Sequence, residues 1–587
     1  FFFLILYNTS LLSQEVIQHP VENYGELPNP TPVDPAKWAN ESAISVGWGS
    51  TDVRYKKEEP AILIGNSNTH VLTAWKGERV SAQFVVSNKS GSRDITYTIG
   101  EFVNQADKKH RIKTENIFSG FVRYVMTDEL NKNGKGSCGH RKTSEFDSTL
   151  VADPIDHYAK TIRIMPMSSQ GVWIRTSVPS DVKSGSYKGT ITVKADGKTI
   201  KKLTLQVNVQ NQVLPSVEDW KFHLDLWQNP FAVARYYRVE PWSDAHFDAL
   251  RKEIRPYVDA GGKVITASIT HKPWNGQTYD YFETMVTWMK KADGNWAFDY
   301  TVFDKWVEFM MSMGVDQQIN CYSMIPWRLS FQYFDQATNS LKFEETKPGD
   351  EAYGEMWTAM LTSFAAHLKA KGWFDKTFIS MDERPMDAML ETLAVIRKAD
   401  PDYKISLAGA LHEELVDELD DYCVALRMKY SDEVVAKRRG EGKITTFYTS
   451  CEESYPNTYT FSPPAESEWF AWYAAKVGLD GYLRWALNSW VSDPLRDSRF
   501  TTWAGGDTYL IYPGARTSMR FEKMIDGIQS YEKIQLLKQK FIENDNRNAL
   551  EQLRMALSIF DETKLEKIPA AEMILKARAV VDKLSEM

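Results

Sequence analysis

Eight short apolar segments, separated by amphipathic runs, fill the middle of this 587-residue sequence and constrain its fold most strongly. The runs between them, such as Phe303–Met311 and Met356–Leu368, carry apolar residues at helical spacing. Strands alternating with helices indicate βα units around a parallel sheet. The eight predicted strands are Lys221–Trp227, Lys263–Thr270, Gln317–Ser323, Lys376–Asp382, Lys404–Ala410, Tyr422–Arg427, Ile444–Ser450 and Gly481–Leu487. We predict a (β/α)₈ TIM barrel over residues 214–515. A doubly wound open sheet is the alternative, but the first strand is followed by no Gly-rich phosphate loop.

The segments on either side of the barrel have different patterns. Residues 41–213 alternate polar and apolar side chains, as in Arg79–Val86, and Asp196-Gly197 is a hairpin turn signal. This pattern predicts an N-terminal β-sandwich. Residues 516–587 carry apolar residues at helical spacing and predict a C-terminal helical extension packed on the barrel. The polar, proline-bearing residues 14–40 are interpreted as a linker.

The first residues, Phe1–Tyr7, resemble the apolar core of a secretory signal peptide without its basic start. We therefore interpret residues 1–13 as a signal-peptide remnant, with Ser13 as a candidate cleavage position. This segment is too short to span a bilayer, and no other apolar run reaches the ~20 residues of a membrane helix. We expect an exported protein without a transmembrane segment, periplasmic or extracellular in a bacterium.

Charge and cysteine usage narrow the classes of partner. The net charge of −8, without a run of Lys and Arg, argues against nucleic acid. The four cysteines show no zinc spacing. Cys321, Cys423 and Cys451 adjoin apolar runs, so we expect buried free thiols, with a disulfide framework as the lesser alternative. The sequence does not settle the pairing of the cysteines.

The fourth predicted strand ends in two adjacent carboxylates, Asp382 and Glu383, followed by Arg384 and Pro385. Removing ionised groups from water is costly unless they are well partnered, so this placement indicates a catalytic pair. Consecutive strand residues point to opposite sides, so the backbone must turn here, and Pro385 supports such a turn. A structural ion pair with Arg384, or a helix N-cap by Asp382, is the non-catalytic alternative.

Aromatic and amide side chains follow other predicted strands. Because barrel enzymes build their sites at the carboxyl ends of the strands, we expect these groups to converge with the carboxylates. Aromatic faces stack on sugar rings and amides bind hydroxyl groups, whereas the alternative role of these aromatics is to fill the barrel rim. The candidate substrate-binding residues are Trp227, His271, Tyr322, Arg384, Tyr448, Trp485, Asn488 and Trp490.

Two adjacent carboxylates fit one variant of glycoside hydrolysis better than the usual pair across the sugar. In this variant the 2-acetamido oxygen of the substrate is the nucleophile. One carboxyl protonates the leaving oxygen and needs a raised pKa, while its ionised neighbour holds the acetamido N–H and stabilises the oxazolinium ring.

The carboxylate pair and two further blocks resemble glycoside hydrolase family 123, the β-N-acetylgalactosaminidases. The first block runs from Gly506-Asp507 through Tyr512-Pro513-Gly514 and Arg520-Phe-Glu522 to Asp526-Gly527-Ile528 and Tyr531-Glu532. The second block, Trp173–Gly189, resembles the sandwich domain of related proteins. The resemblance implies a retaining exo-enzyme that removes terminal β-linked N-acetylgalactosamine from glycans or glycosphingolipids, without metal or organic cofactor. Glu383 would then be the general acid/base, and Asp382 would orient the acetamido group. Tyr448 is assigned to the acetamido oxygen from its position at a strand end.

Two alternatives remain open at this stage. The first is a retaining glycosidase with Glu383 as acid/base and a separate nucleophile among Glu452, Glu453 and Asp493. The second is a non-catalytic carbohydrate-binding protein on the same scaffold. The sequence does not decide between galacto and gluco substrates.

Overall fold

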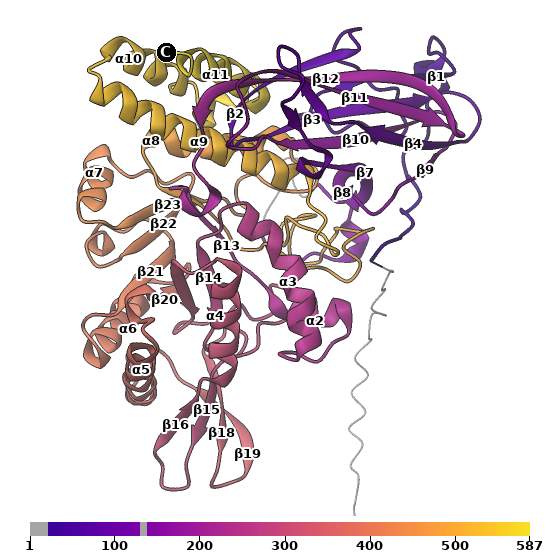
Figure 1. The fold of residues 1–587 in the computed structure, drawn as a ribbon. Coiled ribbons are helices and arrows are strands. Elements are labelled where there is room, and N and C mark those ends of the chain that lie inside the picture. Colours follow the sequence, from indigo (N-terminus) through magenta and orange to yellow (C-terminus); the bar gives the residue numbers. More distant parts are fainter. Residues whose placement is uncertain (1–20, 130–137) are drawn as a thin grey trace, which may run out of the picture.

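The computed structural model describes residues 21–129 and 138–587 and consists of a β-sandwich, a barrel and a group of C-terminal helices (Figure 1). The sandwich and the C-terminal helices lie side by side at the top of Figure 1, and the barrel lies below them. The predicted fold class is therefore confirmed. The predicted signal peptide and residues 14–20 of the predicted linker lie outside the described residues.

The sandwich packs two largely antiparallel sheets around an apolar core. One sheet has the order β1-β3-β10-β7-β8, and the other has the order β2-β12-β11-β4-β9 with β5 and β6 alongside. Inward-facing residues such as Phe84, Val172, Ile191 and Leu205 are fully buried between the sheets. The strands are β1 (Ile44–Gly49), β2 (Thr69–Lys76), β3 (Arg79–Asn88), β4 (Arg93–Ile99), β5 (Phe102–Asn104), β6 (Arg111–Ile112), β7 (Ile117–Thr127), β8 (Thr149–Asp156), β9 (Ile162–Ile164), β10 (Ser168–Ser177), β11 (Gly185–Ala195) and β12 (Lys198–Val213).

The hairpin predicted at Asp196-Gly197 joins β11 to β12. Both turn residues have positive φ, 50° for Asp196 and 77° for Gly197. Such a turn matches the twist of the strands that it joins, and Asp-Gly tolerates its left-handed backbone. The local sequence thus determines this turn.

Residues 21–40 pack against the sandwich, so their interpretation as a linker needs correction. Tyr24 is buried, with the Arg123 guanidinium 4.4 Å from its ring centre. Trp38, at the end of the short helix α1 (Pro35–Trp38), is also buried, and its indole N–H donates to the Glu58 carbonyl at 3.0 Å. The prolines suggested a linker, but these two aromatic side chains anchor the segment.

The eight predicted parallel strands all form, in the order β13-β24-β23-β22-β21-β20-β17-β14. The edge strands β13 and β14 meet where the Lys263 N–H donates to the Leu224 carbonyl at 3.0 Å, so the barrel is nearly closed. Its strands are β13 (His223–Leu226), β14 (Val264–Ser268), β17 (Gln318–Tyr322), β20 (Thr377–Met381), β21 (Lys404–Gly409), β22 (Asp421–Ala425), β23 (Ile444–Tyr448) and β24 (Gly481–Arg484). Its helices are α2 (Pro230–Tyr237), α3 (Asp244–Asp259), α4 (Thr301–Met313), α5 (Glu351–Lys371), α6 (Met386–Ala399), α7 (Asp432–Gly440) and α8 (Pro464–Val477).

A second, four-stranded sheet grows from two loops at the carboxyl ends of barrel strands. It has the order β16-β15-β18-β19 and projects away from the sandwich at the bottom of Figure 1. Its strands are β15 (Thr287–Lys290), β16 (Trp296–Asp299), β18 (Ser330–Asp335) and β19 (Ser340–Glu345). These four strands were not predicted, because they are short and interrupt the βα pattern. Short 3₁₀ helices occupy Thr114–Asn116, Thr143–Glu145, Val217–Asp219, Phe374–Lys376, Glu413–Leu415 and Glu562–Lys564.

The C-terminal helices connect the barrel to the sandwich. They are α9 (Met519–Glu543), α10 (Arg547–Leu557) and α11 (Ala570–Leu584). On α9, Lys523 pairs with Glu468 of the barrel helix α8 at 2.5 Å. The preceding residue, Glu522, binds Arg79 and Arg175 of the sandwich, each at 2.9 Å. The extension packs on the barrel as predicted, and it contacts the sandwich as well.

Strand β8 carries a fully buried carboxylate, Asp153, into the interface between the two domains. Arg54 and Arg520 both pair with it at 2.9 Å, and the Tyr512 hydroxyl donates to it at 2.5 Å. Buried charges need such partners, because removing one partner leaves the other charge uncompensated. Tyr512 and Arg520, which carry part of the family resemblance, therefore hold the two domains together.

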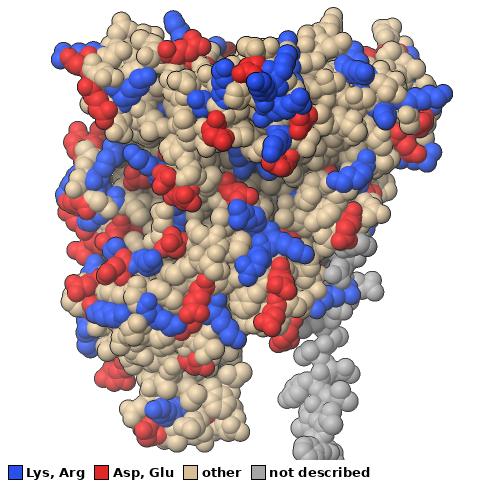
Figure 2. Space-filling view, viewed as in Figure 1, with Lys and Arg blue, Asp and Glu red and all other residues tan. Residues whose placement is uncertain are grey.

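Acidic and basic side chains are interspersed over the molecular face shown in Figure 2. Within residues 21–129 and 138–587, none of the helices has the length and apolar character required to cross a membrane.

Candidate active site

A cavity of about 220 Å³ opens at the carboxyl ends of the barrel strands. Five tryptophans, four carboxylates and the residues that follow β23 form most of its wall. Its lining residues are Cys138, Trp227, Trp274, Gln277, Trp327, Asp382, Glu383, Ala408, Tyr448, Thr449, Ser450, Cys451, Glu452, Leu483, Trp485, Trp503 and Asp507. The predicted catalytic pair therefore lies in a cavity with aromatic walls.

Asp382 immediately follows β20, and the chain turns after it into helix α6, which Pro385 caps. The indole N–H of Trp327 donates to Asp382 Oδ2 at 3.1 Å. The other oxygen, Oδ1, is buried 3.5 Å from the Arg384 guanidinium and receives no hydrogen bond of ordinary geometry from the described residues, although the Trp274 indole lies close enough to lower the pKa of Asp382. Asp382 does not cap the helix, and its ion pair with Arg384 leaves one buried acceptor for a ligand.

Burial raises the pKa of Asp382 from its ordinary 3.8 to about 6. The Arg384 charge and the Trp327 hydrogen bond lower the pKa, but desolvation outweighs them. The raised pKa thus belongs to Asp382, the residue to which the sequence assigned the ionised role. With a pKa of about 6, Asp382 is still mostly ionised at pH 7.5.

Glu383 is exposed and accepts a hydrogen bond at Oε1 from the Tyr448 hydroxyl. Tyr448 ends strand β23, and burial, followed by the charge of Glu383, raises the pKa of its hydroxyl. A neutral Tyr448 therefore remains a hydrogen-bond donor to the carboxylate. Glu383 is consequently oriented by the protein and open to the cavity at the same time.

Aromatic side chains form two parts of the cavity wall. Trp227 and Trp274 lie with their ring centres 4.8 Å apart, and Trp485 meets Trp503 edge-on at 5.6 Å. Apolar walls of this kind, with a few polar groups converging between them, are typical of small-molecule sites.

Three of the eight predicted substrate-binding residues line the cavity: Trp227, Tyr448 and Trp485. Two others, Tyr322 and Arg384, do not line the cavity but pack against residues that do. Tyr322 packs under Trp227, with ring centres 4.5 Å apart, and Arg384 stacks on the Trp327 ring at 3.7 Å. Both act on the site through their neighbours.

The remaining three predicted residues lie outside the cavity. His271 binds Glu283 at 2.6 Å beside a separate groove. Asn488 is fully buried and exchanges hydrogen bonds with the backbone of Asn229 at 2.9 and 3.1 Å. Trp490 is also fully buried, and its indole donates to the Ile511 carbonyl at 2.8 Å. Their place near strand ends was visible in the sequence, but the direction of each side chain was not.

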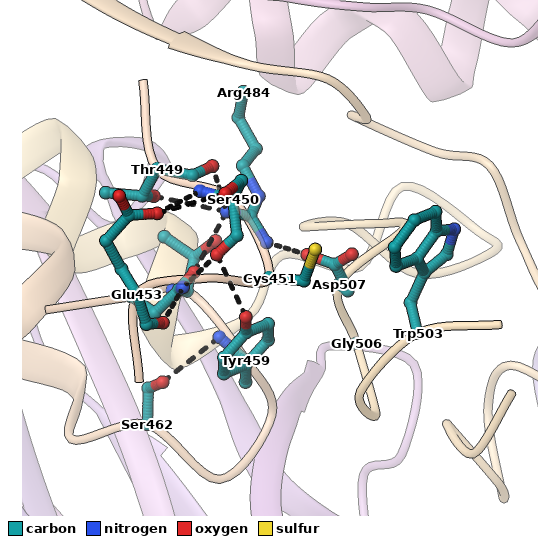
Figure 3. A network of polar contacts seen from close by, with 12 residues as sticks. Thr449, Ser450, Cys451, Glu453, Tyr459, Ser462, Arg484, Trp503, Gly506 and Asp507 are labelled. Atoms are coloured by element: carbon teal, nitrogen blue, oxygen red, sulfur yellow. Dashed lines mark hydrogen bonds and ion pairs between the residues drawn. The ribbon is translucent and has the colours of Figure 1, made fainter. Parts of the chain in front are cut away.

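Gln277, Trp503 and Asp507 also line the cavity, although they were not among the predicted site residues. These residues come from long loops, and only the Gly506-Asp507 motif signalled one of them. Arg484, the last residue of β24, donates a hydrogen bond to Asp507 (Figure 3). Figure 3 shows this carboxylate between the Cys451 sulfur and the Trp503 ring.

Cys138 and Cys451 form a disulfide with a Cα–Cα distance of 5.3 Å, so the expectation of a free thiol at Cys451 is wrong. Cys321 and Cys423 are buried free thiols, as predicted. The bond connects a sandwich loop to the loop after β23, and both cysteines line the cavity. A separation of 313 residues gave no local signal for this pairing.

Two family models match the chain. The catalytic domain of glycoside hydrolase 123 matches residues 227–537, more than half of the sequence, and the N-terminal domain of glycoside hydrolase 123 matches residues 48–195. The chain belongs to glycoside hydrolase family 123. The resemblance inferred from the sequence is thereby confirmed.

Among solved structures, this family 123 protein is similar to a family 123 glycoside hydrolase from Clostridium perfringens, reported in an account of glycolipid glycan hydrolysis. The two share 28% identity with a TM-score of 0.82, over 92% of this chain and 97% of that chain. A Bacteroides ovatus GH5 xyloglucanase aligns over 82% of this chain and 100% of its own at 10% identity, with a TM-score of 0.30, which is too low to support any inference. No curated protein matches the sequence.

Proposed function

We propose that this family 123 hydrolase releases terminal β-linked N-acetylgalactosamine from glycans or glycolipids by substrate-assisted catalysis. The observation that carries the proposal is the buried Asp382 Oδ1, which lacks a hydrogen bond from the described residues and lies beside the exposed Glu383. An acetamido N–H supplies the donor that this oxygen lacks. The Clostridium perfringens relative, reported in an account of glycolipid glycan hydrolysis, supports a glycolipid glycan as substrate.

In the first step, the acetamido carbonyl oxygen attacks C1 of the sugar and the bond from C1 to the leaving oxygen breaks. Glu383 gives its proton to that oxygen, and Tyr448 keeps the carboxyl oriented. The product is a cationic oxazolinium ring, whose N–H donates to Asp382. The negative charge of Asp382 stabilises this cation in a poorly hydrated cavity.

In the second step, Glu383 accepts a proton from water while the water oxygen attacks C1. The oxazolinium C1–O bond breaks, its electron pair returns to the acetamido group, and the sugar leaves with its anomeric configuration retained. One carboxyl group serves both steps, first as acid and then as base. The small cavity favours an exo-enzyme that holds one terminal sugar.

The carboxylates considered as separate nucleophiles have other roles. Glu452 lines the cavity but pairs with Arg427. Glu453 accepts hydrogen bonds from the Ser450 N–H and hydroxyl at 2.7 and 3.1 Å. Asp493 does not line the cavity and lies 3.7 Å from Arg496. This arrangement favours a nucleophile supplied by the substrate.

The decisive experiment compares aryl β-glycosides with and without a 2-acetamido group and adds a thiazoline mimic of the oxazoline. We expect hydrolysis of the acetamido substrates only, with inhibition by the thiazoline. Equal cleavage of plain galactosides without thiazoline inhibition would exclude the mechanism. Absence of any hydrolysis would favour a carbohydrate-binding protein.

Glu383→Gln tests the role of the proton donor. We expect it to reduce turnover of substrates with poor leaving groups far more than turnover of activated aryl glycosides, because only the former need protonation. An equal loss on both kinds of substrate would show that Glu383 is not simply the acid.

We also propose that the protein is exported. The disulfide Cys138–Cys451 supports this localisation, because disulfides persist in oxidising compartments and are rare in the cytosol. Fractionation of the native host should find the activity in the periplasm or medium, and recovery in the cytosol alone would contradict export.

A further inference from the structure

Besides the catalytic pair and Glu452, the cavity holds a further carboxylate, Asp507, which the mechanism above does not use. It is buried, with an exposed fraction of 2%, in the loop that follows β24. Arg484 binds it (Figure 3), and Arg484 is itself held by the Thr449 carbonyl at 2.7 Å and by Asn457 Oδ1 at 2.9 Å. The carboxylate is therefore fixed in place before any substrate enters.

The topology places this carboxylate across the cavity from the catalytic pair. In the order β13-β24-β23-β22-β21-β20-β17-β14, nearly closed between β13 and β14, strands β24 and β20 are four steps apart in either direction. Asp382 and Glu383 follow β20, whereas Arg484 ends β24 and carries Asp507. The two acidic groups thus lie on opposite sides of one barrel mouth.

A single pyranose ring fits this arrangement in one orientation. Glu383 must reach the oxygen at C1 and Asp382 the acetamido group at C2. On a six-membered ring, C4 is the corner opposite C1, so the edge that carries the 4-hydroxyl faces Asp507. An ionised carboxylate has about four acceptor positions, and its contacts with Arg484 and the Trp485 indole leave room for a hydroxyl donor.

We propose that Asp507 binds the 4-hydroxyl of the sugar and thereby determines the choice between galacto and gluco substrates. The inference rests on the proposed N-acetylhexosaminidase function and adds a specificity-determining residue to it. The axial and equatorial 4-hydroxyls of the two sugars point in different directions, and Arg484 prevents Asp507 from following both. A buried polar site rejects a substrate that leaves it unpaired.

Deoxygenated substrates test the proposal on the unmodified enzyme. Aryl β-N-acetylgalactosaminide is compared with its 4-deoxy, 4-deoxy-4-fluoro and 6-deoxy analogues. We expect kcat/KM to fall about ten- to a hundredfold for both analogues altered at C4, because fluorine cannot donate to a carboxylate. The 6-deoxy analogue is the matched control and should stay within about threefold of the parent. Equal kcat/KM for the parent and the 4-deoxy analogue would overturn the proposal.

Asp507→Asn provides the second measurement. We expect the galacto-to-gluco ratio of kcat/KM to fall at least about tenfold in this variant. We also expect the variant to have nearly the same kcat/KM on the parent and the 4-deoxy substrate, because the variant and the 4-deoxy substrate each lack the same contact. An unchanged ratio, or a covalent glycosyl-enzyme on Asp507 by mass spectrometry, would contradict the proposal.

The substitution leaves Arg484 without its counter-charge, so folding is checked by circular dichroism. If the variant fails to fold, the deoxy series decides alone. These results are distinguishable from failure of the proposed function, because that failure would show as no cleavage of any acetamido substrate by the wild type.

Discussion

Asp382→Asn should make the enzyme much slower and, at the same time, more stable. The substitution keeps the size of the side chain and its ability to accept a hydrogen bond from Trp327. It removes the negative charge that we assign to stabilising the oxazolinium. Activity and stability should therefore change in opposite directions, which a merely structural residue would not produce.

The expected loss of rate follows from the charge interaction. Two opposite charges about 4 Å apart attract by about 4 kcal/mol at an effective dielectric constant of about 20. Losing that attraction in the transition state lowers kcat by about a thousandfold.

The expected gain in stability follows from the pKa of Asp382. The folded pKa of about 6 lies above the ordinary 3.8, so ionisation of the carboxyl destabilises the folded state. The difference between the two pKa values corresponds to about 3 kcal/mol of destabilisation of the folded state. This destabilisation is present in full above pH 6 and disappears as the pH falls from 6 to 3.8. At pH 7.5 the variant should gain up to this amount, and below pH 3.8 it should gain nothing.

Denaturant unfolding at pH 7.5 and pH 3.5, with initial rates on an aryl β-N-acetylgalactosaminide, measures both effects. Asp421→Asn is the matched control, because burial also raises the pKa of this barrel carboxylate to about 6 and it does not line the cavity. We expect the control to gain stability but keep its kcat. Wild-type rates should also decline below about pH 6, as Asp382 becomes protonated. A full-rate Asp382→Asn variant, or one that is destabilised at pH 7.5, would refute this reasoning.

Three further outcomes are expected. Tyr448→Phe removes the donor to Glu383, and kcat/KM should fall about ten- to a hundredfold with unchanged circular dichroism, whereas full activity would argue against this contact. Replacing Cys138 and Cys451 by serine should lower the free energy of unfolding by at most about 5 kcal/mol. A reductant should have no further effect on the stability of this variant. An unchanged denaturation midpoint would show that the disulfide adds no stability. His271→Ala should leave aryl-glycoside kinetics within about twofold of wild type, because His271 lies beside a separate groove; a tenfold rise in KM would place it in the substrate site.

Local sequence predicted the parts of this protein whose structure depends on short-range patterns. The eight barrel strands and the Asp196-Gly197 turn formed where periodicity and turn chemistry indicated. The Asp382-Glu383 pair was found because carboxylates at the end of an apolar strand are costly unless they have a function.

Tertiary structure decided which side chains share the cavity. Trp227 and Trp490 both follow barrel strands, yet Trp227 lines the cavity and Trp490 is fully buried with its indole donating to the Ile511 carbonyl. The direction of a loop side chain depends on the elements packed around it, which no local pattern records. The same holds for the Cys138–Cys451 bond, which joins residues from two domains.

By itself, then, the sequence determined the order of the domains, the strands of the barrel and the position of the acidic pair. Only the folded barrel placed Asp507 opposite that pair and left Asp382 with a raised pKa and a buried oxygen that receives no hydrogen bond of ordinary geometry from the described residues. The physical reason is that periodicity and turn chemistry act between neighbouring residues, whereas burial and electrostatics depend on segments that meet only in the folded chain.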